Sequence, residues 1–361
     1  MEYFSSDALC NFSIDIFKKI GCSTEHAELA AGVLSSADLR GVDSHGIARL
    51  IGYIRLWEKD RINSQPNIRI THQTPSTAVV DGDQGLGLVV APEAMKIAIE
   101  KAMNVGTGWV AIRNSNHFGI AGYHAMLPLE KDMIGLAMTN ASPIVAPTFS
   151  KDRLLGTNPI AVAIPAENEP PFVADFATTT VANGKLEILQ RKNESAPYGW
   201  VQTKEGSPSQ SPQEVANGGS LLPLGGDRDH GGHKGYCLGA WVDIFSAVLS
   251  GANYGPWVPP FVAFLEPSPN PVGRGIGHFV GAMRVDAFRP AKEFKQHMDQ
   301  WIRTFRDAET VAGQQKVLIP GDPEREQEQI RKEEGVPLLP PVIESLQQLA
   351  EKFRVEFPAK A

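Results

Sequence analysis

The sequence has little cysteine and no concentration of positive charge. Its three cysteines, Cys10, Cys22 and Cys237, are an odd number and lack the spacing of a metal site. We therefore expect reduced thiols in a cytoplasmic protein and no disulfide framework. The formal net charge is -7, and no cluster of Lys and Arg interrupts it. Because nucleic acids bind to basic surfaces, we expect no nucleic-acid partner.

A signal peptide and a membrane span are also missing. The N-terminus, "MEYFSSDALC", contains acids and lacks a charged-then-apolar pattern. The most apolar region, 237–265, carries Asp243 in its middle, and Pro256, Pro259 and Pro260 interrupt its second half. A buried helix followed by a strand fits this region better than a membrane span. We therefore expect a soluble protein with no membrane partner.

The common nucleotide-binding loops are absent as well. No G-x-x-x-x-G-K-[ST] loop is present, and the near match to a dinucleotide-binding loop is "GTGWVA", with Gly106, Gly108 and Ala111. A Rossmann loop follows a strand and opens a helix, so that the helix amides point at the pyrophosphate. Here a helical pattern precedes the glycines and a strand pattern follows them. We therefore reject a Rossmann loop at this position.

What the sequence does contain is an alternation of helix and strand patterns. Helical periodicity dominates the first 60 residues, and strands and helices alternate from Ile68 onward. A stretch rich in Gly, Ser and Pro, 190–235, is the best candidate for a mobile flap. The pattern predicts an α/β body flanked by helices from both chain ends. Strands are expected in "IRITHQTPSTAVVDGD" (two), "GWVAIRN", "IGLAMTN", "NPIAVAIPA", "PFVADFA" and "GHFVGAMRVDAF", and later helices in "APEAMKIAIEKAMNVG", "AGYHAMLPLEKDM", "KGYCLGAWVDIFSAVLSGA", "PAKEFKQHMDQWIRTFRDA" and "PPVIESLQQLAEKFRV".

The segment "RGVDSHGIARL" places Ser44, His45 and Arg49 within six positions. If a helix begins at Asp43 or Ser44, His45 and Arg49 lie four residues apart on one helix face. A capping hydroxyl at a helix N-terminus, an imidazole and a guanidinium then form a carboxylate clamp, because Arg binds a carboxylate through two hydrogen bonds. A capped surface helix with a solvated arginine explains the same spacing.

Three further residues are candidates for binding or chemistry. His117 follows a strand, in a turn rich in Gly and Asn, where an imidazole suits acid–base work or hydrogen bonds the turn backbone. Asp175 ends an apolar strand, where a carboxylate accepts ribose hydroxyls or caps a helix. Lys234 begins a long helix, and it either reaches a phosphate or is solvated.

A metal site would have to use His230 and His233, together with His45 and His278. The glycines between His230 and His233 give no rigid ligand geometry, and no H-E-x-x-H motif or Cys pair is present. We therefore expect no metal site.

Six segments together resemble the type 2 malate/L-lactate dehydrogenase family, which also includes ureidoglycolate dehydrogenase and the piperideine/pyrroline-2-carboxylate reductases. They are "DLRGVDSHGIARL", "SNHFGIAGYH", "LLGTNPIAVAIPA", "DFATTTVANGK", "GGHKGYCLGAWVDIFSAVLSGA" and "GHFVGAMRVDAF". Each segment alone is weakly diagnostic, but the ordered set is specific and extends over nearly the whole chain.

The resemblance implies a homodimeric oxidoreductase that uses NAD or NADP and has a non-Rossmann α/β fold. It implies a helical substrate and dimer domain formed by 1–75 with 290–361, and an α/β domain over 76–289. Within the α/β domain, 125–195 is the main cofactor-binding part and 190–235 is a flap.

The resemblance also implies roles for individual residues. His117 looks like the acid/base, and Ser44, His45 and Arg49 look like the substrate pocket. The substrate would be a small 2-hydroxy acid of the malate or lactate type, oxidised to its 2-oxo acid by hydride transfer. The implied cofactor positions are Asn140, Ala141, Asp175, Phe176, Ala177, Lys234, Gly321, Asp322 and Pro323.

Four positions depart from the pattern of the family. Phe149 and Ser150 stand where a Gly pair is usual and place bulk near the expected cofactor segment, and Thr203 and Ser211 stand where relatives usually carry aspartates. The alternatives of the same chemistry are a reductase of a cyclic imino acid and a ureidoglycolate dehydrogenase. Alternatives from other classes are a metal hydrolase and a catalytically silent relative that binds the cofactor.

Overall fold

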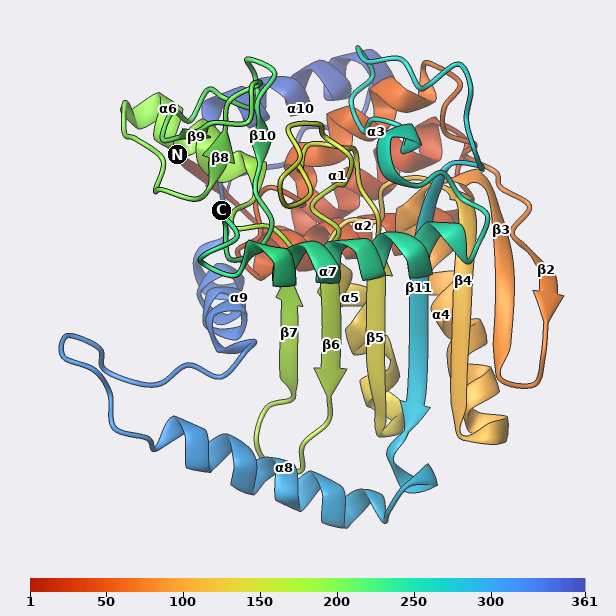
Figure 1. Ribbon diagram of the computed structural model, residues 1–361. Helices are drawn as coiled ribbons and strands as arrows, with labels where there is room; N and C mark the ends of the chain where they lie inside the picture. The colour runs from red at the N-terminus through yellow and green to blue at the C-terminus, as the bar shows by residue number, and fades with distance from the viewer. Residues whose placement is uncertain (361) are drawn as a thin grey trace.

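The computed structural model describes residues 1–360, and a seven-stranded sheet lies at its centre (Figure 1). The strand order across the sheet is β2-β3-β4-β11-β5-β6-β7. β3 and β4 pair in parallel and the other neighbours pair antiparallel, so the sheet is mixed. All of these strands coincide with segments in which the sequence predicts a strand. They are β2 (Arg69–Gln73), β3 (Thr77–Gly85), β4 (Thr107–Ser115), β5 (Met133–Thr139), β6 (Ile160–Ile164), β7 (Phe172–Phe176) and β11 (Ile276–Arg284).

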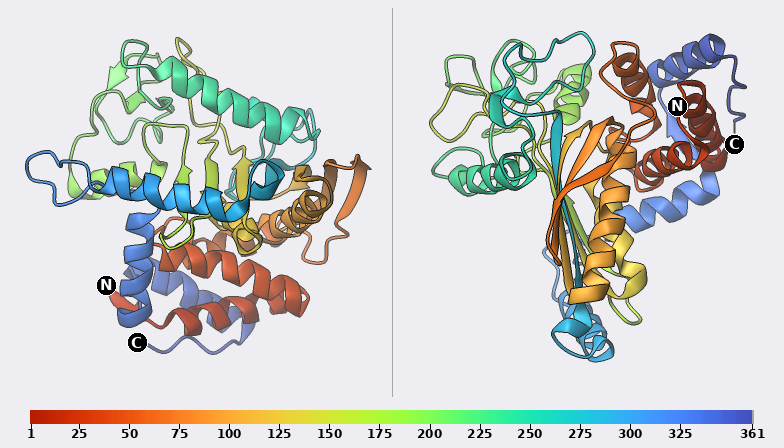
Figure 2. Two further views of the ribbon diagram at one scale, coloured as in Figure 1. Left: turned by 90° about the horizontal axis from the view of Figure 1, so that it is seen from below. Right: turned by 90° about the vertical axis from the view of Figure 1, so that its right-hand side faces the viewer.

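Helices cover the sheet on both faces (Figure 2). One face packs against α4 (Gly87–Val105) and α5 (Ala121–Met126), and the short 3-10 helix η2 (Leu127–Lys131) continues α5. Across the other face runs α7 (Gly232–Asp243), which continues as the π-helical turn η3 (Ile244–Val248). Side chains alternate along each strand, so in β4 Val110 and Ile112 join the first core, whereas Trp109 and Ala111 face α7.

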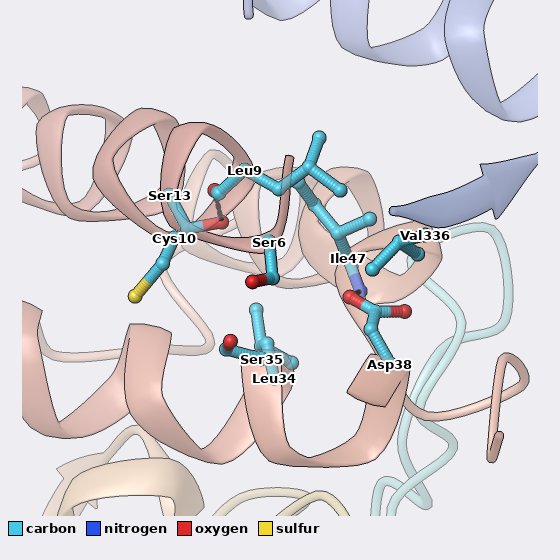
Figure 3. Close-up of a pocket in the computed structure, with 9 residues that line it drawn as sticks. All are labelled: Ser6, Leu9, Cys10, Ser13, Leu34, Ser35, Asp38, Ile47 and Val336. Carbon is cyan, nitrogen blue, oxygen red and sulfur yellow. Dashed lines mark hydrogen bonds between the residues drawn. The ribbon is translucent and has the colours of Figure 1, made fainter. Parts of the chain in front are cut away.

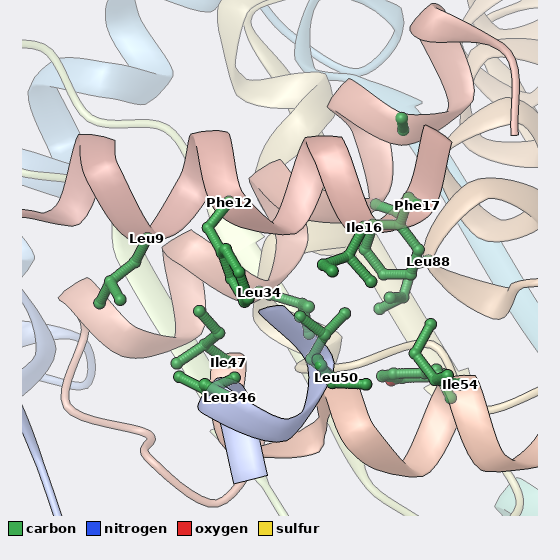
Figure 4. Close-up of a cluster of buried hydrophobic side chains, with 14 of the residues drawn as sticks. Leu9, Phe12, Ile16, Phe17, Leu34, Ile47, Leu50, Ile54, Leu88 and Leu346 are labelled. Carbon is green, nitrogen blue, oxygen red and sulfur yellow. The ribbon is translucent and has the colours of Figure 1, made fainter. Parts of the chain in front are cut away.

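Helices from both chain ends share a second core (Figure 4). α1 (Ser6–Lys19), α2 (Thr24–Leu39), α3 (Leu50–Trp57) and α10 (Pro340–Phe353) contribute it, and β1 (Glu2–Phe4) pairs antiparallel with β12 (Val336–Leu338). The apolar periodicity of these helices explains the contact, because each buries one stripe against the others. The labelled side chains of this core are Leu9, Phe12, Ile16, Phe17, Leu34, Ile47, Leu50, Ile54, Leu88 and Leu346.

α8 (Ala291–Arg306) lies away from these terminal helices, along the opposite end of the sheet (Figure 1). The carboxylate of Asp299 accepts hydrogen bonds from the backbone N–H groups of 167–169, which form the turn between β6 and β7. The sequence predicted this helix correctly. The resemblance, however, groups 290–361 in one domain with the terminal helices, whereas α8 packs on the α/β body. The 3-10 turn η5 (Val285–Ala287) joins it to β11.

α9 (Asp322–Glu334) was not among the expected elements. Its sequence, "DPEREQEQIRKEE", has no apolar stripe, and Arg331 is its buried residue. A helix without an apolar face gives no periodic signal. The sequence signals that could have indicated it are the proline in its first turn and Gly335 just after its last residue.

The segment 190–235 is folded around a small apolar core. After α6 (Asn183–Lys192) it contains β8 (Val201–Gln202), β9 (Pro208–Ser209) and β10 (Ser220–Leu221), which form a separate three-stranded sheet. Val201 and Leu221 pack with Val145, Leu155 and Leu186. Mobility of this segment as a flap stays a prediction.

The region 237–265 differs from the expected buried helix and strand. α7 and η3 expose Trp241, Ile244 and Leu249, and the chain after residue 250 has the 3-10 turn η4 (Gly255–Trp257) followed by irregular loop. The strand prediction was wrong, because the prolines that interrupt the region lack the N–H groups that a strand needs for its ladder. Among the described residues, no helix combines the length and apolarity needed to cross a bilayer.

Candidate active site

His117 lies just past the end of β4, in the turn that leads to α5. Its ring is half-buried. The ring nitrogen Nδ1 lies 2.7 Å from the hydroxyl oxygen of Tyr53 on α3, and the N–H of Gly119 approaches the same nitrogen at 3.3 Å. Burial, followed by the positive charges of nearby His45 and Arg49, holds the pKa of His117 well below its usual 6.5. The imidazole is therefore neutral at pH 7, with one nitrogen oriented by the protein.

Tyr53 is a functional residue that the sequence analysis missed. It is fully buried, and burial raises the pKa of its hydroxyl, so the group stays protonated. Tyr53 belongs to the buried face of α3, with Leu50, Ile54 and Leu56, and reaches His117 from it. Its position four residues after Arg49 was the signal that could have identified it.

Ser44, His45 and Arg49 do not share one α-helix. α3 begins at Leu50, after the 3-10 turn η1 (Ile47–Arg49), and Ser44 lies in the preceding turn. Its hydroxyl is 2.8 Å from Nδ1 of His45, and Nε of Arg49 donates to its carbonyl. The expected N-terminal anion site is therefore wrong, because neither Ser44 nor Asp43 caps a helix.

Asp38 of α2 explains why α3 begins at Leu50 and not at Asp43 or Ser44 (Figure 3). Its buried carboxylate accepts the backbone N–H of Ile47 at 2.8 Å. A Cβ on Gly46 would lie 1.7 Å from the same carboxylate, so this close approach requires glycine. Arg331 of α9 adds a second anchor by donating to the carboxylate of Asp43 and to the carbonyl of Asp38. The loop that carries Ser44 and His45 is thus fixed from two helices.

The two histidine segments form one site. The rings of His45 and His117 are stacked, with centroids 5.4 Å apart and planes 25° apart. Burial, followed by the charge of Arg49, lowers the pKa of His45 to about 4. Phe261, which the sequence analysis also missed, stacks on His117 at 4.2 Å and lies 5.9 Å from the guanidinium carbon of Arg49. A hollow of ≈ 550 Å³ opens beside Arg49 and is lined by Ile51, Gly52, Arg55 and Phe261 among others.

Several expected cofactor positions gather at the β7 edge of the sheet. Asp175 and Phe176 end β7, and Ala177 follows them. One carboxylate oxygen of Asp175 accepts the N–H of Gly122 at 2.7 Å, and burial is the main cause that raises the pKa of Asp175 to about 6. Gly321 lies against Val173 of the same strand, at the start of α9. The structure therefore places Gly321 beside the strand that carries Asp175 and Phe176.

Other expected cofactor residues hold the protein itself together. The side-chain amide of Asn140 donates to Asp243 at 2.9 Å and to the carbonyl of Asn253 at 2.8 Å, so both of its hydrogens are engaged. The N–H of Ala141 donates to Asn158. Asp322, next to Pro323, accepts from the N–H of Ile319 and from Arg325, which anchors the turn before α9. Lys234 is exposed in the first turn of α7.

The remaining histidines do not converge on a metal site. His278 is buried between the hydroxyls of Ser115 and Thr139, at 2.8 and 2.7 Å, whereas His230 is exposed beside Asp227. Within residues 1–360, no group of three His, Cys, Asp or Glu side chains has a geometry that could hold a metal ion.

The four positions that depart from the family pattern lie in turns. Phe149 adopts φ 70°, in the left-handed region where glycine is favoured, and its ring is 89% exposed. It therefore adds no bulk to the site, contrary to the expectation from the sequence. The hydroxyl of Thr203 accepts from Glu205 N–H, and that of Ser211 from Gln213 N–H, so both hold local turns.

We expect the replacement of Asp38 by asparagine to change the pH dependence of stability. Burial, the largest cause, raises the pKa of Asp38 to about 7, with Asp43 adding to the rise and the Ile47 N–H and Arg331 opposing it. The stabilisation from the bound proton is complete below about pH 3.9 and is lost as the pH rises through 7. Asparagine keeps an acceptor for Ile47 but does not titrate. The free energy of unfolding of Asp38→Asn minus that of the parent should therefore rise by ~1–3 kcal/mol between pH 5 and pH 8.

Urea denaturation at several pH values measures this difference, with Asp60→Asn at an exposed position as the control. A constant difference between the Asp38→Asn variant and the parent across this range would show that Asp38 is already ionised at pH 5.

Known proteins are similar to this chain over nearly its whole length. A family model described as malate/L-lactate dehydrogenase matches residues 4–347. The chain is 41% identical over 351 residues to a malate dehydrogenase of Pyrococcus abyssi, a match that covers 97% of this chain and 94% of the relative. It is 40% identical over 321 residues to an L-sulfolactate dehydrogenase of Methanocaldococcus jannaschii, with 89% and 88% covered. The crystal structure of malate dehydrogenase from Entamoeba histolytica superposes with a TM-score of 0.92 at 35% identity, and 99% of each chain is covered.

Proposed function

The chain belongs to the malate/L-lactate dehydrogenase family and is an oxidoreductase that acts on 2-hydroxy acids. From this premise we propose that it interconverts a small 2-hydroxy acid and its 2-oxo acid with NAD or NADP. The observation that carries the proposal is the convergence of His117, His45 and Arg49. The rings of the two histidines are stacked, and Phe261 contacts both the His117 ring and Arg49, which lines the hollow. The names of the relatives, malate and sulfolactate dehydrogenase, support a substrate with a hydroxyl beside a carboxylate.

His117 is the proposed acid/base. In the tautomer that serves as base, the Nδ1 hydrogen is donated to the Tyr53 hydroxyl, and the longer contact with the Gly119 N–H is given up. Nε2 then takes the hydroxyl proton of the substrate, and the same nitrogen returns the proton in reduction. The lowered pKa of His117 suits the base role at pH 7. A carboxylate bound nearby stabilises the imidazolium and so raises this pKa when the substrate enters.

Arg49 is the proposed carboxylate ligand. Its Nε is held by the Ser44 carbonyl, which fixes the plane of the guanidinium and leaves its two terminal nitrogens for a carboxylate. His45 and Ser44, joined by a hydrogen bond, lie beside Arg49 and are proposed to contact the substrate. The pocket thus orients the substrate C2 without providing redox chemistry of its own.

The proposed cofactor site is the β7 edge of the mixed sheet. Binding there would be of the non-Rossmann kind that the resemblance implies. The second carboxylate oxygen of Asp175 suits ribose hydroxyls, the exposed Phe176 ring offers a stacking surface, and Lys234 offers a cation for a phosphate. This donor set fits a dinucleotide, with Ala177 and 321–323 beside it. A bound nicotinamide supplies the hydride acceptor or donor.

We also propose a cytoplasmic homodimer, in which the terminal helices form the substrate side. Its three free cysteines support a reducing compartment. The resemblance puts the dimer contact on the terminal helices, whereas the exposed apolar side chains of α7, η3 and the residue after them favour a contact on the α/β body. They are Trp241, Ile244, Val248 and Leu249. Light scattering of the purified protein checks the mass.

A panel of 2-oxo acids and cyclic imino acids with NADH and NADPH, followed at the nicotinamide absorbance, tests the function. We expect turnover with a 2-oxo acid that has a short polar side chain. Turnover with cyclic imino acids alone would assign the chain to imine reduction, since the same pocket serves both. Cofactor binding without turnover on any substrate would favour the silent relative.

A further inference from the structure

Phe261 lies in an irregular loop that is nevertheless held firmly in place. Arg61 donates to the carbonyls of Pro260, Val262 and Leu265, the last at 3.0 Å. The backbone N–H of Phe261 donates to the hydroxyl of Ser142 at 3.2 Å. One guanidinium and one hydroxyl thus fix the backbone on both sides of the Phe261 side chain.

The ring of Phe261 fills the space against His117. The two rings are stacked, with centroids 4.2 Å apart and planes 25° apart, and Phe261 meets the ring of Tyr53 edge to face at 5.0 Å. The ring also lies close to α3, because a Cβ on Gly52 would make an ordinary contact with its atoms at 3.6 Å. The same ring lines the hollow beside Arg49. Phe261 therefore borders both the imidazole and the space for a ligand.

We propose that Phe261 is a positioning residue for His117, whose ring covers one face of the imidazole, fixes its plane and excludes water from it. The inference rests on the proposed function of His117 as acid/base. The loop 260–265 thereby becomes part of the catalytic machinery, although it carries no group that exchanges protons.

The charged and titratable groups around His117 determine whether its pKa rises or falls when the Phe261 ring is removed. They are His45, Arg49, Tyr53, His124 and His278, and none of them is a carboxylate. Burial is the largest cause of the lowered pKa of His117. Removing the Phe261 ring admits water to the imidazole and stabilises its protonated form, so the pKa of His117 rises toward its ordinary value.

The test compares Phe261→Ala with Phe261→Tyr and with Phe288→Ala. Tyrosine keeps the ring, and Phe288 is a control because it lies at the end of η5, outside the hollow, and is 75% exposed. NMR titration of the His117 ring, assigned with a His117→Gln variant, reads the imidazole directly and needs no turnover. The pH profile of kcat/KM reads the same group during catalysis.

We expect Phe261→Ala to raise the pKa of His117 in the NMR titration and in the acid limb of the kcat/KM profile. Phe261→Tyr and Phe288→Ala should leave both in place. If the ring of His117 regains a pKa near 6.5, kcat/KM at pH 6 falls to about a quarter of its value at pH 8. Phe261→Leu, which covers the face only partly, should give a smaller shift and serves if the alanine variant does not fold.

An unchanged His117 titration in a folded Phe261→Ala or Phe261→Leu variant would refute the positioning role. If the parent protein turns over no substrate, the proposed function fails instead, and the NMR titration still decides whether Phe261 controls the imidazole.

Discussion

Replacing His117 with alanine is expected to lower turnover by about 10²- to 10⁴-fold, while the nicotinamide cofactor still binds. The imidazole is held neutral by burial close to Arg49, and its orientation depends on Tyr53. Without it, the proton of the substrate hydroxyl must leave to water, which is a poorer and less ordered base. The expected cofactor residues at the β7 edge do not contact His117, so their contribution to binding should persist.

Steady-state kinetics and cofactor fluorescence titration measure the two effects separately. His230→Ala is the control, because that ring is exposed and pairs with Asp227. Near-normal turnover of His117→Ala would remove His117 from the acid/base role. A loss of cofactor affinity as large as the loss of turnover would instead place His117 in cofactor binding.

Replacing Arg49 with lysine is expected to lower kcat/KM for the 2-oxo acid by about 100-fold or more. Hydrogen bonds to a charged group contribute roughly 1.5–3 kcal/mol each, and a lysine cannot form the paired arrangement of a guanidinium. Lysine also cannot keep both the bond to the Ser44 carbonyl and the contact with a carboxylate. The loss should appear mainly in KM, because the carboxylate is bound in the ground state as well as in the transition state.

Arg55→Lys is the matched control, since Arg55 is an exposed arginine of α3 that lines the same hollow. Little loss in either variant would show that the hollow attracts anions only by its net charge, which lysine keeps. An unchanged KM in Arg49→Lys would exclude Arg49 as the carboxylate ligand.

The strands of the central sheet were predictable because each carries a local pattern. Alternation along β4 and β11 indicates which side chains face the helices, and this alternation needs no knowledge of distant residues. α9 was not predictable in this way, since "DPEREQEQIRKEE" buries almost nothing.

The site was predictable in its residue types and only partly in its geometry. Ser44, His45, Arg49 and His117 do meet, as the resemblance implied. The start of α3 depends on a hydrogen bond from Ile47 to Asp38, nine residues upstream, which no local pattern reveals. Phe261 could not be found from the sequence, because it approaches His117 from a loop more than 140 positions away and has no periodic neighbours.

Expected cofactor residues show the same limit. Asn140 matches the family pattern, yet both of its amide hydrogens are engaged with Asp243 and Asn253. A residue can therefore follow a family pattern because it holds the site together, without touching a ligand. Its hydrogen-bond partners distinguish the two cases.

The most direct measurement is a crystal structure of the protein with reduced nicotinamide cofactor and a non-reactive analogue of a 2-oxo acid. We predict the analogue's carboxylate on the terminal nitrogens of Arg49, and its C2 oxygen within about 3 Å of Nε2 of His117. An analogue that contacts one of these two side chains while the other points away from it would contradict the proposed reaction.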